Sequence, residues 1–219
     1  MKRITITICA AIVLFFFSCN NDKTEDKATS KDSTKTLSDT SKMSDQTMMA
    51  PMDSAAMMKA WQSYMTPGDV HKMLAKSNGT WDEDVTTWMD ASKPPMKSKS
   101  TAVNKMILGG RYQQSTHTGT MMGMPFEGIS TVGYDNAKKM MVSTWVDNMG
   151  TGVMYMEGNF DSTTHMANFK GKMVDPMTGK DTDFRETFTM MDDNNQKIEM
   201  FATQGGKEMK TMEIVLKRK

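Results

Sequence analysis

One carboxylate in the second half of the chain is placed where it could recognise a ligand. Alternate residues from 184 to 190 read Phe, Glu, Phe and Met, so Glu186 shares a strand face with Phe184 and Phe188. Such a face points into an apolar interior, where an unpaired carboxylate is costly or has a raised pKa. Glu186 is therefore either a ligand contact or half of a buried pair with Arg111 or Gln113, and both alternatives stay open.

The three histidines form no zinc motif. His71, His117 and His165 fall in separate predicted elements, and no two are four residues apart as in a helical zinc site. We expect His71 at the surface. His117 or His165 could reach a cavity as the axial ligand of a heme, which is the less favoured possibility. No Gly-x-Ser-x-Gly nucleophile motif is present, so we predict neither an enzyme nor a metal or cofactor site.

Cys19 is placed as a lipidation site. A basic N-terminus precedes an apolar run over residues 4–17, which is shorter than the ~20 residues that span a bilayer. Phe16–Phe17–Ser18–Cys19 resembles a bacterial lipobox, although Leu is usual at its first position. We expect residues 1–18 to be a cleaved signal peptide. The acylated Cys19, carrying a fatty acid such as palmitate, would then anchor the chain in the bilayer of the cell envelope, at the outer membrane.

Residues 19–54 differ in composition from the remainder. They are rich in Ser, Thr, Lys and Asp and poor in large apolar side chains, so they cannot bury enough surface to offset their ordering entropy. We predict a disordered tether, followed by a helical segment over 55–78 and a β-barrel over 79–219. The net charge of +1, without a basic stripe, argues against nucleic acid as a partner.

Methionine is the most unusual feature of the composition, with 28 residues among 219. Thioether sulfurs select Cu(I), and Met121–Met122–Gly123–Met124 is the best local candidate for such a site. The methionines, however, occupy nearly every apolar position from 57 to 212 and do not cluster with histidine in the sequence. We therefore favour a core role for them, and Cu(I) binding is a less favoured alternative.

Helical spacing precedes the strands. Large apolar residues recur at intervals of three and four over 55–75, which predicts a helix interrupted at Thr66–Pro67–Gly68–Asp69. Thr66 is the expected N-cap and Pro67 the first residue of a second short helix, which runs to Lys76.

From Thr80 onward the pattern has a period of two. Nine turn clusters rich in Gly, Asn, Asp and Pro separate ten short runs. The runs cover 80–89, 99–108, 111–119, 126–134, 139–147, 153–160, 165–174, 182–191, 196–203 and 209–217. Ten strands joined by tight turns predict a mainly β fold, an antiparallel up-and-down barrel. A split sandwich is the alternative.

Two resemblances extend this prediction. Gly79–Thr80–Trp81 resembles the Gly-x-Trp of lipocalins and the wider calycin group, where the Trp closes the barrel base and stacks on a basic residue near the end of the last strand. That resemblance implies a closure pair of Trp81 and Arg218. Several further motifs resemble a bacterial family of secreted domains of unknown function, DUF1579, which implies a fold but no chemistry. They are Met65–Thr66–Pro67–Gly68, Leu108–Gly109–Gly110–Arg111–Tyr112, Gly123–Met124–Pro125–Phe126–Glu127–Gly128, Gly133–Tyr134–Asp135 and Gly158.

These features favour a lipid-anchored, calycin-like barrel that binds a small, mostly apolar ligand. The competing hypothesis is a solid barrel that serves as an envelope scaffold or interaction protein. The candidate ligand-binding residues are Glu186, Arg111, Gln113, His117, Trp145, Phe169, Phe184 and Phe188.

Overall fold

The computed structural model describes residues 53–90 and 92–219. The predicted signal peptide, Cys19 and nearly all of the predicted tether lie outside these residues. The helices are α1 (Ser54–Met65) and α2 (Asp69–Lys76), and the strands are β1 (Gly79–Thr87), β2 (Met96–Ile107), β3 (Tyr112–Met121), β4 (Met124–Asp135), β5 (Met140–Asp147), β6 (Met154–Asp161), β7 (Met166–Val174), β8 (Asp181–Met190), β9 (Asn195–Gln204) and β10 (Lys207–Arg218). Neither helix is long and apolar enough to cross a membrane.

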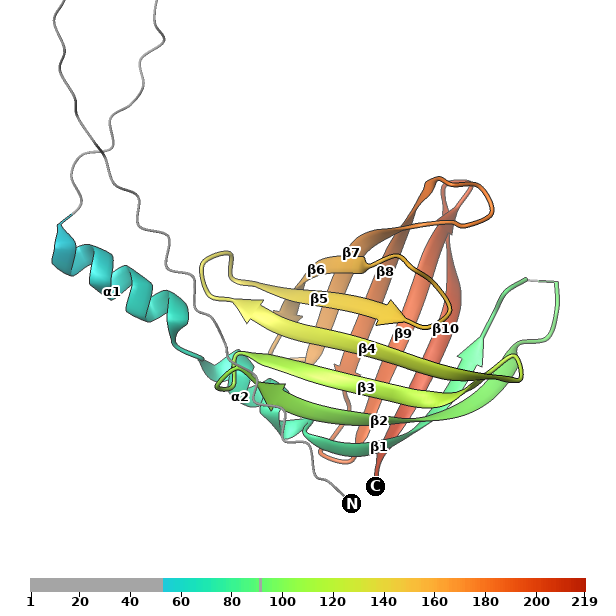
Figure 1. Cartoon of the computed structure of the whole chain (residues 1–219), viewed down its shortest axis with the longest axis horizontal. Coiled ribbons are helices and arrows are strands. Elements are labelled where there is room, and N and C mark those ends of the chain that lie inside the picture. Colours follow the sequence, from blue (N-terminus) through green and yellow to red (C-terminus); the bar gives the residue numbers. More distant parts are fainter. Residues whose placement is uncertain (1–52, 91) are drawn as a thin grey trace, which may run out of the picture. The chain divides into compact units, whose positions relative to one another are not determined.

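The ten strands form one closed barrel. Each strand pairs antiparallel with the next along the chain, and β1 pairs with β10 to complete the ring (Figure 1). Closure leaves no unpaired sheet edge. The predicted up-and-down barrel is therefore confirmed, and the split sandwich is wrong.

The helix boundaries differ from the prediction. Thr66 was expected to cap the start of the second helix, but it is the C-cap of α1, and its Oγ1 donates to the carbonyl of Gln62 at 2.6 Å. α2 begins at Asp69. The Pro–Gly pair between them forms an extended connection, because the residue before a proline is disfavoured in helical conformation.

His71 is buried, with 4% of its surface exposed, so the prediction of a surface position is wrong. Its Nδ1 accepts a hydrogen bond of 3.0 Å from the backbone N–H of Gly68, and its ring meets Tyr134 edge-on. Burial lowers the pKa of this imidazole. The side chain therefore stabilises the start of α2 as a neutral acceptor.

α2 covers one end of the barrel, which we call the capped end. Leu74 is 2% exposed within the barrel core, and its carbonyl accepts a hydrogen bond from Gln113 Nε2 at 2.6 Å. The carbonyl of Ser77 accepts from both Asn104 Nδ2 and Trp81 Nε1, at 3.1 and 2.9 Å. Side chains of three strands thus satisfy the carbonyls at the end of α2, which leave the helical ladder at a C-terminus.

α1 has no buried residue. Its large apolar side chains are between 45% and 70% exposed. They are Met57, Met58, Trp61, Tyr64 and Met65. The predicted helical periodicity is real, but within the described residues it does not bury the apolar face of this helix.

Candidate ligand-binding lumen

Glu186 lies on the inner face of the barrel, whose interior we call the lumen. It is paired with Phe169 of β7 on one side and Met200 of β9 on the other. Phe169 belongs to the core and is 2% exposed, so the paired carboxylate points inward with it. Burial alone raises the pKa of Glu186 from 4.5 to about 7, with no hydrogen bond or charge from the described residues opposing it.

The side chains around Glu186 are not fully buried. Its neighbours on the same face, Phe184, Phe188 and Met200, are only partly buried, and so is Glu186 itself. Because β8 lies in a closed sheet, this accessible surface faces the lumen. Eight-stranded barrels are just filled by their side chains, and a ring of ten is wider.

The buried apolar residues form two clusters. The first gathers Leu74 of α2 with residues of β5, β6 and β7, including Phe169. The second contains Trp81, Ala102 and Leu216, from β1, β2 and β10. Partly buried residues connect the two clusters, because Phe188 packs against the first, Ile198 packs against the second, and these two residues are paired between β8 and β9.

A second inward-facing carboxylate, Glu83 of β1, has hydrogen-bond partners. β1 and β8 are three strands apart around the ring, by way of β10 and β9. His117 of β3 places Nδ1 3.0 Å from Glu83 Oε1, and Ser100 Oγ donates to Glu83 Oε2 at 2.6 Å. Glu83 and His117 are 2% and 7% exposed. This buried group is hydrogen-bonded on both carboxylate oxygens and needs no ligand.

Trp145 extends the polar group along the same wall. Its ring meets His117 edge-on at 5.1 Å, and its Nε1 donates to Asp147 Oδ2 at 2.7 Å. A Cβ at Gly128 of β4 would lie 2.4 Å from the Trp145 ring, so glycine at that position is what admits the indole. Trp145 is only partly buried, which leaves an aromatic surface beside the hydrogen-bonded pair.

Two of the residues predicted to approach Glu186 do not do so. Arg111 is exposed in the turn before β3, where its Nη1 donates to the carbonyl of Leu108 at 3.1 Å. Gln113 is buried, but its amide donates to the carbonyl of Leu74 in α2. The predicted pair between Glu186 and Arg111 is therefore wrong, because the alternation of the strand stops at the left-handed residues Leu108, Gly109 and Gly110.

Trp81 and Arg218 meet at the capped end. They are opposite each other in the pairing of β1 with β10, and the guanidinium carbon lies 4.2 Å from the centre of the Trp81 ring. The same guanidinium donates to the carbonyls of Lys76, Asn78 and Asp193. This arrangement ties the first strand, the last strand and the end of α2 together, away from the lumen.

His165 and the methionine motif lie away from the lumen. His165 is exposed in the turn between β6 and β7 with a φ of 52°, so its predicted place at the start of a strand is wrong. Met122, in the turn between β3 and β4, is 60% exposed, and Met124, the first residue of β4, is 49% exposed. In the described residues, no three His, Cys, Asp or Glu side chains gather as a metal site.

A family model described as "Protein of unknown function (DUF1579)" matches residues 66–218, which is the whole barrel with α2. The chain belongs to the DUF1579 family. The boundary of the DUF1579 match excludes α1, whose apolar side chains contribute nothing to the barrel core. No curated protein matches the sequence.

Solved structures similar to this DUF1579 protein show its fold alone. A crystal structure of Rv2717c from M. tuberculosis aligns with a TM-score of 0.54 at 12% identity, covering 70% of this chain and 99% of that one. A redesigned beta barrel aligns with a TM-score of 0.35 at 13% identity, covering 67% and 94%, which does not establish a shared fold.

Proposed function

We propose that this DUF1579 protein is a lipid-anchored component of the bacterial cell envelope whose barrel binds a small, mostly apolar molecule without catalysing a reaction. The body of the ligand would contact the partly accessible side chains of the lumen, namely Phe184, Phe188, Met200 and Trp145. Apolar pockets with a few placed polar groups are the usual form of small-molecule sites.

The observation that carries this proposal is the unpartnered carboxylate of Glu186. A buried carboxylate without a partner is costly, and a ligand that supplies a hydrogen-bond donor offsets that cost. Glu83 already has its donors, whereas the Glu186 carboxylate has none among the described residues. The ligand that fits best therefore has an apolar body and one donor group, with a protonated amine as the strongest partner.

Three probes of equal chain length test this assignment: octylamine, octanol and octanoate. At pH 8, the wild-type full chain should bind octylamine most tightly, and octanoate should be rejected by the like charge of Glu186. Glu186→Gln should weaken octylamine by about tenfold or more while leaving octanol nearly unchanged. Calorimetric titration measures all three affinities.

Asp183→Asn is the matched control, because it removes one carboxylate from the exposed face of the same strand. It should change none of the affinities. Failure of the wild type to bind any of the three probes would contradict the lumen site. Equal loss of octylamine in both variants would assign its binding to general charge attraction.

The anchoring part of the proposal rests on the apolar run and Cys19, which lie outside the described residues. Wild-type protein grown with a palmitate analogue should incorporate the label, and Cys19→Ser should abolish it. An unlabelled wild type would contradict the anchor and leave the lumen assignment intact.

A second candidate is an interaction protein with no ligand, and the exposed apolar face of α1 is the observation that favours it. Apolar patches of this kind mark interaction surfaces. This candidate predicts that the lumen takes up none of the three probes, so the same titration separates the two functions.

A further inference from the structure

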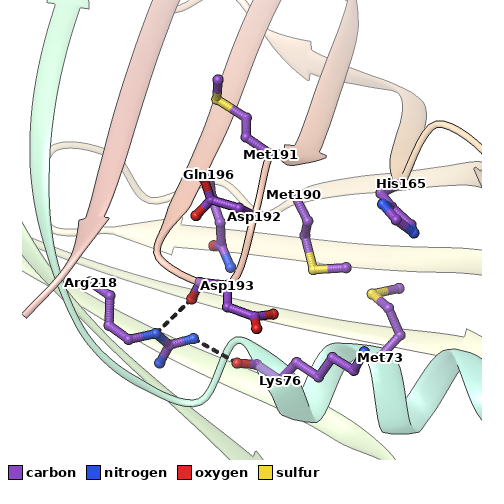
Figure 2. A pocket seen from close by; sticks show the side chains of 9 residues that line it. All are labelled: Met73, Lys76, His165, Met190, Met191, Asp192, Asp193, Gln196 and Arg218. Carbon is purple, nitrogen blue, oxygen red and sulfur yellow. Dashed lines mark hydrogen bonds between the residues drawn. The ribbon is translucent and has the colours of Figure 1, made fainter.

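A pocket of about 180 Å³ at the capped end lies outside the lumen site. Three of its lining residues carry soft donor atoms and come from three different elements: Met73 from α2, Met190 from the end of β8 and His165 from the turn between β6 and β7. Figure 2 shows the side chains of Met73 and Met190 pointing toward one another, with the ring of His165 beside them and Met191 directed away. The sequence does not place these three residues near one another.

The backbone fixes two of the three donors. The N–H of Met190 donates to the carbonyl of His165 at 3.1 Å, which extends the pairing of β7 with β8 by one step beyond its last strand pair. Met73 packs against the core cluster that includes Leu74, and this packing restrains its side chain. Three donors are therefore held around one cavity by the closed sheet and the capping helix.

These donor atoms make few other interactions with the described residues. Met190 Sδ accepts a long contact of 3.6 Å from Ser77 Oγ, and thioether sulfur is a weak acceptor. The ring of His165 makes no hydrogen bond to the described residues and is exposed to solvent, where a metal could reach it. Both sulfurs and an imidazole nitrogen are therefore available as ligands.

The donor set selects the class of ion. Thioethers are soft ligands that favour Cu(I), and imidazole also suits copper, whereas Ca²⁺ and Mg²⁺ require oxygen ligands. The charged residues that line the pocket are hydrogen-bonded or lie near an opposite charge. Arg218 donates to the carbonyls of Asp193 and Lys76, and the carboxylates of Asp192 and Asp193 offset the two cations on the same rim.

We propose that Met73, Met190 and His165 bind one soft monovalent ion, Cu(I), at the capped end of the barrel. This site is separate from Met121–Met124 and from the lumen, and it does not depend on the proposed ligand. Neutral sulfur and nitrogen donors match a single positive charge, and Ag(I) is the redox-inert probe with the same preferences.

Competition titration of the full chain with Ag(I) tests the site. The variants are Met73→Leu, Met190→Leu and His165→Gln, of which the first two conserve volume in the partly buried pocket and the third changes an exposed turn. Each should weaken Ag(I) binding by about tenfold, and the double Met variant by about a hundredfold. X-ray absorption of the Cu(I)-loaded protein, prepared without oxygen, should show two sulfurs and one nitrogen.

Met122→Leu with Met177→Leu is the control, since these residues are 60% and 93% exposed in other turns. It should leave the tightest Ag(I) site unchanged and remove only weak surface binding. Equal affinity of the wild type and the double Met73 and Met190 variant overturns the proposal. Retained affinity in His165→Gln with an all-sulfur absorption spectrum also overturns it.

Discussion

Glu83 and Glu186 both face the inside of this barrel, and their surroundings differ in kind. Glu83 on β1 is hydrogen-bonded to His117 and Ser100 and is almost fully buried. Glu186 on β8 is surrounded by Phe169, Met200 and other apolar side chains and has no partner in the described residues. Buried charges in proteins are usually paired with a hydrogen-bonding or charged partner. The proposed ligand site therefore rests on Glu186, the unpaired member of the two.

The largest effect is expected from truncation of the partnered carboxylate. Glu83→Ala leaves the Ser100 hydroxyl and the His117 ring buried without their acceptor, and should cost about 3–5 kcal/mol of the free energy of unfolding. Urea denaturation measures this loss. Glu186→Ala strands no partner and removes a buried charge, so at pH 8 it should leave the free energy of unfolding unchanged or raise it. Equal losses of unfolding free energy at Glu83 and Glu186 would contradict the distinction between a partnered and an unpartnered carboxylate.

A second, smaller effect is the dependence of stability on pH. Because the pKa of Glu186 is raised from 4.5 to about 7 by burial, the native state binds this proton more tightly than the unfolded chain. Its contribution to stability is therefore fully present below about pH 4.5, and it is lost as the pH rises to about 7. The loss is on the order of 3 kcal/mol.

Glu186→Gln should remove this dependence. Between pH 5 and pH 8, the free energy of unfolding of the variant should therefore rise relative to that of the wild type. Comparing the two proteins cancels every other titrating group. Parallel stability curves would show that Glu186 is solvated like a surface carboxylate.

The smallest predicted effect concerns the hydrogen bond between Ser100 and Glu83. Ser100→Ala removes one hydrogen bond from Glu83 and leaves His117 in place, so the expected loss of stability is about 1 kcal/mol. Thr101→Ala, a change on the adjacent strand position that makes no hydrogen bond to Glu83, is the control and should cost less. A loss at Ser100 no larger than at the control would mean that His117 alone satisfies the carboxylate.

Strand alternation accounts for what could be predicted from the sequence. Ten period-two runs between turn clusters gave the barrel, because each turn carries residues that tolerate left-handed backbone, such as Gly205 and Gly206 with φ of 58° and 77°. The same alternation placed Glu186 with Phe184 and Phe188. Local pattern is sufficient where each strand pairs with its neighbour along the chain.

The remaining features depend on contacts between distant residues. Glu83 lies in the run Asp82–Glu83–Asp84, which is typical of a solvated surface, and only its alternation with Trp81 and Val85 marks it as inward. Arg111 was placed inward by extending the alternation past the end of a strand. His71 was misjudged because its partners, Gly68 and Tyr134, become neighbours only when α2 caps the barrel.

A native mass spectrum of the protein purified from its own host tests the lumen site most directly. A ligand-binding barrel predicts that the native wild-type mass exceeds the mass of the same protein after denaturation by one small molecule, which is depleted in Glu186→Gln but retained in Asp183→Asn. A wild-type protein that carries no such molecule, and that also takes up no octylamine at pH 8, would contradict a ligand-binding barrel.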